Sequence, residues 1–156
     1  MKTDFFISYT SKDQQQAEWV AWILEENGYS VVIQAWDFKP GNNFVLEMQN
    51  ATKAANKTIA ILSKKYLNAL YTQPEWAAAF AKDPNGESSN LIPIRVQECI
   101  LEGMLSNIIY IDLVNKDDQE ATEILLRGVS GQRLKPTSPP KLFTESLNSG
   151  NPTSSK

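Results

Sequence analysis

The chain has 156 residues, of which 42% are hydrophobic and 10% aromatic, enough for one globular domain with a buried core. Its 15 Lys and Arg residues against 18 Asp and Glu residues give a net charge of -3, which argues against binding nucleic acid or a membrane surface by bulk electrostatics. The chain contains no histidine, which excludes Ser-His-Asp and Cys-His catalysis and histidine-based zinc sites.

The only cysteine, Cys99, has no partner for an internal disulfide. Asp4 interrupts the amino-terminal run too early for the apolar region of a signal peptide, and no apolar run is long enough to span a membrane. We therefore expect a reducing, cytoplasmic location.

The amino-terminal part of the chain alternates between strand and helix patterns. Residues 4–9 predict a short apolar strand, and Ser11 with Gln14 predicts a capping box that begins a helix. Asn27-Gly28 ends this helix, whose buried face consists of Ala17, Val20, Ala21 and Leu24. The β-branched run 30–34 predicts a second strand, and residues 35–42 predict a loop.

The alternation continues through the rest of the domain. The patterns predict a helix over residues 43–55, a strand over 57–62 and an interrupted helix over 64–80. They then predict strands over residues 90–96 and 108–113 and a last helix over 116–129. Pro74 interrupts the second of these helices. The first is expected to bury a stripe of Val45, Met48, Thr52 and Ala55.

Near-continuous apolar strands that alternate with helices are typical of a parallel sheet covered on both faces. Five such units most often adopt the strand order 2-1-3-4-5, which is a flavodoxin-like, three-layer α/β fold. Ligands of this fold bind outside the carboxyl ends of the strands, between the loops that follow strands one and three. The segments that converge there are residues 8–10, 36–41 and 63–76.

The carboxyl-terminal residues have a different composition. Proline, serine and threonine are frequent from Gln132 onward, which is typical of a tail or linker. We therefore predict one domain over residues 1–133 and a flexible tail or linker over residues 134–156. Composition does not separate a flexible terminus from a linker to a further module.

Common nucleotide sites of this fold are excluded by the residues after strand one. Neither a GxxxxGK[ST] loop nor a GxGxxG turn is present at residues 8–12, which contain no glycine. A phosphoryl-accepting receiver domain needs acids after strand one and at the end of strand three, where this chain has Ser8 and Ser63.

Glu75 is the acid with the most informative setting. Pro74 suits the first position of a helix, so we expect Thr72 or Gln73 to cap a new turn that carries Glu75. Tyr71 precedes Glu75 by four residues, and an aromatic face with a carboxylate can hold a ribosyl ring. Spacing alone favours the simpler interpretation, in which the acid only compensates the helix dipole and Tyr71 is an ordinary packing residue.

At these residues the sequence resembles a TIR (Toll/interleukin-1 receptor) domain of the bacterial type, over about residues 1–133. The run DFFISYTSKD resembles the first motif of that family, and WDFKPG resembles its loop after strand two. Residues 63–76 resemble its S-x-x-Y-L motif and the following aromatic-Cys-x-x-Glu motif, with Thr72 in place of the cysteine.

The resemblance implies an NAD+ nucleosidase, because many members of the family cleave NAD+ to nicotinamide and ADP-ribose or a cyclic ADP-ribose isomer. The catalytic glutamate of the family corresponds to Glu75. The residues that correspond to substrate contacts are Ser8, Tyr9, Thr10, Trp36, Asp37, Lys39 and Tyr71. NAD+ is then the substrate, and no resident cofactor or metal is expected.

The resemblance leaves two further points open. Trp36 and Asp37 can belong to an assembly surface instead of the substrate site. The whole domain can also be a non-catalytic module for TIR-TIR interaction, whereas the enzyme would act in bacterial immune or stress signalling. In either case the resemblance implies self-association and a module fused beyond the tail.

Overall fold

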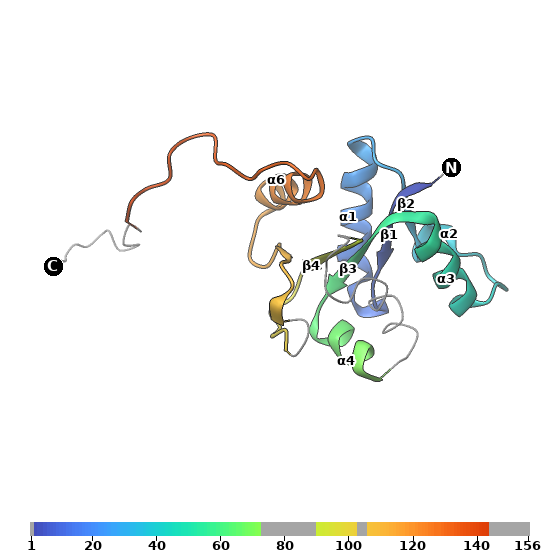
Figure 1. Cartoon of the computed structure of the whole chain (residues 1–156). Helices are drawn as coiled ribbons and strands as arrows, with labels where there is room; N and C mark the ends of the chain where they lie inside the picture. Colours follow the sequence, from blue (N-terminus) through green and yellow to red (C-terminus); the bar gives the residue numbers. More distant parts are fainter. Residues whose placement is uncertain (1, 73–89, 103–105, 144–156) are drawn as a thin grey trace.

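The computed structural model describes residues 2–72, 90–102 and 106–143. Five strands form one sheet in the order β2-β1-β3-β4-β5, and every neighbouring pair is parallel. The strands are β1 (Thr3–Ser8), β2 (Val31–Ile33), β3 (Ala55–Leu62), β4 (Leu91–Arg95) and β5 (Ile111–Asp112). The predicted parallel sheet and its strand order are confirmed (Figure 1).

Helices cover both faces of the sheet and complete the three layers. Helices α1 (Gln14–Glu26) and α6 (Asp118–Val129) pack on one face, and α3 (Phe44–Ala54) and α4 (Lys64–Thr72) pack on the other. Two short elements lie at the ends of β1 and β2, the 3-10 turn η1 (Ser11–Asp13) and helix α2 (Gln34–Asp37). The flavodoxin-like fold expected from the sequence is therefore confirmed.

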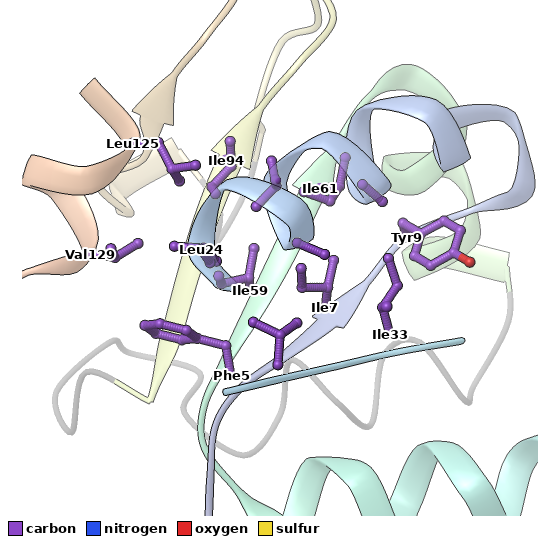
Figure 2. Close-up of a cluster of buried hydrophobic side chains, with 14 residues drawn as sticks. Phe5, Ile7, Tyr9, Leu24, Ile33, Ile59, Ile61, Ile94, Leu125 and Val129 are labelled. Atoms are coloured by element: carbon purple, nitrogen blue, oxygen red, sulfur yellow. The ribbon is translucent and has the colours of Figure 1, made fainter. Parts of the chain in front are cut away.

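The alternating side chains of β1 divide the core into two clusters. Phe5 and Ile7 belong to the cluster under α1 and α6, whereas Phe6 belongs to the cluster under α3 and α4. Figure 2 shows the first cluster, in which Leu24 of α1 meets the sheet beside Ile59 of β3. The predicted buried face of α1 is confirmed, since Ala17, Val20, Ala21 and Leu24 are all fully buried.

Three local expectations are wrong. Ser11 does not begin α1 with a capping box, because residues 11–13 form η1 and the helix begins at Gln14. The segment after β2 is not wholly a loop, because Phe38 donates its N–H to the carbonyl of Gln34 and closes α2. Val45 is 39% exposed, since it lies in the first turn of α3 and the buried stripe begins one turn later, at Met48.

The described part of the tail, residues 134–143, is exposed and contains neither helix nor strand. It leads away from the sheet and its helices (Figure 1), and Arg127 of α6 donates a hydrogen bond to the carbonyl of Lys135. Residues 144–156 lie outside the described ranges, so the domain boundary at residue 133 stays a prediction. In the described ranges no helix combines the length and apolar character needed to cross a membrane.

Candidate functional site

A groove of about 340 Å³ lies at the carboxyl ends of β1 and β2, where the fold is expected to bind ligands. Its walls come from the loop after β1, from α2 and the following loop, and from the first turns of α1 and α3. Gly41 closes the loop with a φ of +94°, a conformation that glycine adopts without strain. The lining residues are Tyr9, Gln14, Gln34, Ala35, Phe38, Lys39, Pro40, Gly41, Asn42, Phe44 and Glu47.

Tyr9 connects the groove to the core. Its ring is 4% exposed and belongs to the cluster under α1, and its hydroxyl points away from the other side chains of that cluster (Figure 2). Burial raises the pKa of Tyr9, and the negative charge of Glu18 raises it further. A hydrogen bond with the backbone of Ala35 acts in the opposite direction and lowers the pKa. The Tyr9 hydroxyl therefore stays protonated at neutral pH and can serve as a neutral polar group at the groove.

The predicted residues after β2 have three different environments. Lys39 lines the groove. Asp37 turns back, and its Oδ2 accepts the N–H of Ile33 at 2.8 Å, so this carboxylate fixes α2 against the end of β2. Trp36 is 43% exposed, and its indole N–H donates to Oε1 of Glu18 on α1 at 3.2 Å.

A buried polar network joins the end of β1 to the start of α4. Ser8 is 1% exposed, and its hydroxyl lies 2.8 Å from that of Tyr66, which is fully buried. Oδ2 of Asp13 accepts hydrogen bonds from the hydroxyls of Thr10 and Ser63. The Ser63 hydroxyl also accepts the N–H of Tyr66, so it caps the first turn of α4.

This network gives the S-x-x-Y-L motif a physical role that the sequence alone does not supply. Ser63 caps α4, Tyr66 reaches the end of β1, and Leu67 packs in the cluster beneath the helix. Ser8 and Thr10, two predicted substrate contacts, therefore have hydroxyls that are bonded within the protein. Asp13, Ser63 and Tyr66 were not predicted as site residues, because their mutual contacts join residues far apart in the chain.

The third predicted segment is described only in part. Tyr71 belongs to α4, which ends at Thr72, where the Thr72 hydroxyl donates to the carbonyl of Asn68. Glu75 lies outside the described residues, as does the turn that Thr72 or Gln73 is expected to cap. The catalytic assignment of Glu75 therefore stays a prediction.

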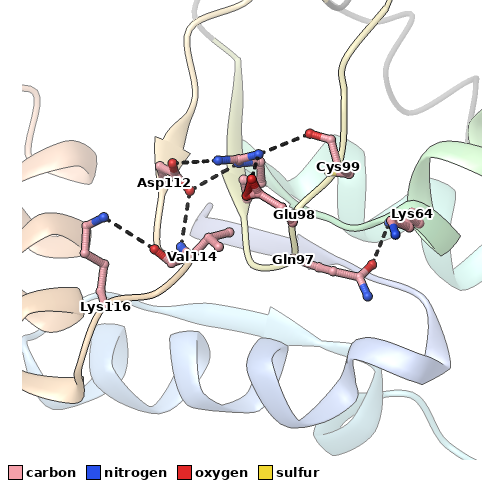
Figure 3. Close-up of polar contacts among 8 residues, drawn as sticks. Lys64, Gln97, Glu98, Cys99, Asp112, Val114 and Lys116 are labelled. Carbon is pink, nitrogen blue, oxygen red and sulfur yellow. Dashed lines mark hydrogen bonds and ion pairs between the residues drawn. The ribbon is translucent and has the colours of Figure 1, made fainter.

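A second polar cluster lies at the carboxyl ends of β4 and β5 (Figure 3). The Arg95 guanidinium binds both carboxylate oxygens of Asp112, at 3.2 and 2.9 Å, and also contacts Glu98, the carbonyl of Cys99 and the ring of Tyr110. This hydrogen bonding lowers the pKa of Asp112, with burial acting in the opposite direction. Because these groups satisfy one another, the cluster ties β4 to β5 and is not a candidate catalytic site.

The described ranges hold no group of three or more Cys, Asp or Glu side chains arranged to bind a metal ion. Glu47 is the acid that lines the groove there, and its carboxylate accepts a hydrogen bond from the side-chain amide of Asn42 at 2.8 Å. Asp37, which follows β2 but does not line the groove, is committed to the N–H of Ile33. The arrangement suits an organic ligand held by Tyr9, Lys39 and the loop backbone.

Solved structures with the same fold include the TIR domain of a Toll-related receptor from Hydra magnipapillata. It is 23% identical, with a TM-score of 0.63 over 83% of this chain and 96% of that one. A prokaryotic SEFIR domain is 21% identical, with a TM-score of 0.65 over 90% of this chain and 99% of that one. A metazoan TIR-STING receptor from C. gigas is 21% identical, with a TM-score of 0.68 over 82% of this chain and 39% of that one.

No curated protein matches the chain. A family model described as a TIR domain matches residues 5–126, a range that begins within β1 and ends within α6 and so spans the whole sheet. The order of the strands, the groove after β2 and the capped start of α4 agree with that match. The chain belongs to the TIR domain family.

Proposed function

We propose that this TIR domain is an NAD+ nucleosidase that cleaves the bond between nicotinamide and ribose. The observation that carries the proposal is the groove at the carboxyl ends of β1 and β2, which brings Tyr9 and Lys39 to one ligand-sized space. Helix α4, which carries Tyr71 and precedes Glu75, starts from the same edge of the sheet. The sequence motif and the groove thus point to the same end of the fold.

The chemistry needs no histidine. The nicotinamide nitrogen of NAD+ is cationic and leaves as a neutral base when the glycosidic bond breaks, so the leaving group takes no proton. The barrier lies in the positive charge that develops at the ribosyl carbon, as in glycoside cleavage. In this proposal the Glu75 carboxylate accepts hydrogen bonds from the ribose hydroxyls and stabilises that charge.

The remaining residues bind and enclose the substrate. The resemblance assigns Tyr71 and Trp36 to the wall around the nicotinamide ribose. Of the groove-lining residues, Tyr9 offers a neutral hydroxyl, and Lys39 offers a cation to the anionic diphosphate. A new bond from a water oxygen to the ribosyl carbon gives ADP-ribose, and that water releases one proton. Attack by a group of the same nucleotide gives a cyclic isomer, which is the alternative product.

Mass spectrometry of the products tests the proposal. Purified protein at high concentration is incubated with NAD+, and we expect nicotinamide together with ADP-ribose or its cyclic isomer. Incubation in water enriched in oxygen-18 separates the two, because hydrolysis places the heavy oxygen in ADP-ribose and cyclisation does not. NAD+ that is recovered intact at every protein concentration contradicts the proposal.

We further propose that the domain self-associates, in the cytoplasm, within a longer bacterial signalling or immune protein. The support is a set of exposed apolar side chains on α2 and in the first turn of α3, two elements that contribute to the groove: Trp36, Phe44, Val45 and Leu46 are between 38% and 54% exposed. Trp36→Ala should weaken self-association, as measured by light scattering. Nicotinamide release per molecule should rise with protein concentration if neighbours complete the site.

The same exposed apolar side chains favour a second candidate function, a TIR-TIR interaction module without catalysis. The two functions differ in one result. A pure interaction module would show concentration-dependent association that Trp36→Ala weakens, with no nicotinamide release from NAD+. The enzyme shows release that falls together with association in the same variant.

A further inference from the structure

We propose that Asp13 is a positioning residue of the NAD+ site, because its carboxylate holds the segment after β1 and the start of α4 in one fixed arrangement. The proposal rests on the proposed function. It concerns a residue that does not line the groove and that acts through Thr10 and Ser63.

The contacts of Asp13 run between elements that are distant in the chain. Its Oδ2 accepts the Thr10 hydroxyl at 3.0 Å and the hydroxyl of Ser63, fifty residues away. Thr10 follows β1 among the predicted substrate contacts, and Ser63 caps the helix that carries Tyr71. One oxygen atom therefore links the segment after β1 to the start of α4.

The place of Asp13 in its own helix makes this link notable. Asp13 occupies the position before α1, where an aspartate side chain normally accepts an N–H of the first helical turn. Here the side chain makes no such capping bond and reaches toward Ser63. The carboxylate therefore serves the link between elements and does not cap α1.

Burial of this carboxylate is costly, and no cation offsets the cost in the part of the chain that the structure describes. Asp13 is 8% exposed, and the ion pairs in those ranges join Arg95 to Glu98 and to Asp112. Burial of a carboxylate is unfavourable unless hydrogen bonds replace its lost hydration, and here the hydroxyls of Thr10 and Ser63 supply them. Its contribution is a defined geometry, since two hydroxyl groups must meet one oxygen.

A second contact fixes the same helix from another direction. The Tyr66 hydroxyl lies 2.8 Å from that of Ser8, so α4 is held at its cap by Asp13 and along its first turn by β1. Loss of the Asp13 link leaves the Ser8 link in place. We therefore expect the helix to remain folded but to shift, and a shift of about 1 Å at a reacting group can reduce turnover about a hundredfold.

The test compares Asp13→Ala with Asp13→Asn, and uses Asp4→Ala as the matched control. Asp4 lies near the opposite end of β1, and its Oδ2 also accepts two hydrogen bonds, from the N–H and the hydroxyl of Ser30. The values of kcat and KM for NAD+ are measured at a temperature where circular dichroism shows each variant to be fully folded. A loss of stability alone leaves kcat per folded molecule unchanged.

We expect Asp13→Ala to lower kcat at least tenfold while KM changes less than threefold, because the groove itself remains. Asp13→Asn keeps an oxygen acceptor and should recover most of the lost turnover, and Asp4→Ala should match the wild type. If Asp13→Ala does not fold, Ser63→Ala, compared with Ser63→Thr, which keeps the hydroxyl, provides the same contrast.

Two results overturn the proposal, and they differ from each other. If kcat for Asp13→Ala, or for Ser63→Ala in its place, stays within twofold of the wild type, the contact is only structural and the proposed function is unaffected. If the wild type itself does not cleave NAD+, the proposed function fails and the positioning role fails with it.

Discussion

The hydrogen bond between Ser8 and Tyr66 can be measured by a double-mutant cycle. Both residues are almost completely buried, and their hydroxyl oxygens lie 2.8 Å apart. Tyr66→Phe removes one hydroxyl and leaves that of Ser8 buried without this partner, which costs about 1 to 3 kcal/mol. Ser8→Ala removes the other hydroxyl and should cost a similar amount, about 1 to 2 kcal/mol.

The double variant should lose less stability than the sum of the two single losses, because neither of the two hydroxyls then remains buried without its partner. We expect a coupling free energy of about 1 kcal/mol from urea denaturation of the wild type and the three variants. For a chain of this size each kcal/mol also moves Tm by about 2 to 4 °C. Losses that add to within about 0.3 kcal/mol would refute the inference that the contact stabilises the fold.

Repeating the urea denaturation at increasing pH above neutrality gives an independent check. Burial raises the pKa of Tyr66 above its ordinary value of 10.0, whereas the hydrogen bond to Ser8 acts in the opposite direction. The unfolded chain therefore releases this proton at a lower pH than the folded chain does. The resulting stability is full below about pH 10 and is lost as pH rises above it, and Tyr66→Phe should remove that dependence.

Three other substitutions or truncations test separate parts of the structure. Gly128→Ala should destabilise α6 by about 1 kcal/mol, because the new Cβ would lie 2.8 Å from Cγ1 of Ile111 and closer still to its Cδ1. This crowding should outweigh the gain in helix propensity, which is about 1 kcal/mol, and a rise in Tm would contradict it. Asp112→Asn should lower the free energy of unfolding by only about 0.5 to 1 kcal/mol near pH 7, because the Asp112 side chain is 38% exposed. Below about pH 4 the stability that comes from the lowered pKa of Asp112 is lost, so the difference from the wild type should shrink. A constant difference down to about pH 2 would show that the charge plays no part. Deletion of residues 136–156 should leave Tm within about 2 °C of the full chain, because a segment of this composition buries too little apolar surface to offset its chain entropy. A large fall in Tm would show that the tail packs on the domain.

The fold was predictable from the sequence because its signals are local and redundant. Runs such as residues 59–62 are apolar throughout, as expected for a strand covered on both faces, and the face of α1 repeats at helical spacing. The two short elements after β1 and β2 were not predicted. Each depends on a few hydrogen bonds, such as that from Ile33 to Asp37, which leave no periodic pattern in the sequence.

The candidate site was predictable in outline only. The resemblance identified Tyr9 and Lys39, which line the groove, whereas Asp37 proved to be an acceptor for the backbone of β2. Gln14 and Glu47 line the groove as well, but they come from the first turns of two helices and carry no motif of their own. The link between Asp13 and Ser63 depends on strand order, so it becomes visible only when β1 and β3 are placed side by side.

The central claim is that this TIR domain cleaves NAD+ by means of the Glu75 carboxylate. The most direct measurement is the rate of nicotinamide release by the wild type, by Glu75→Gln and by Glu26→Gln as a control on the solvent side of α1. We expect Glu75→Gln to lose at least a hundredfold in rate with unchanged Tm, and Glu26→Gln to retain the wild-type rate. A Glu75→Gln variant whose rate stays within about tenfold of the wild type, a barrier difference of about 1.4 kcal/mol, would contradict it.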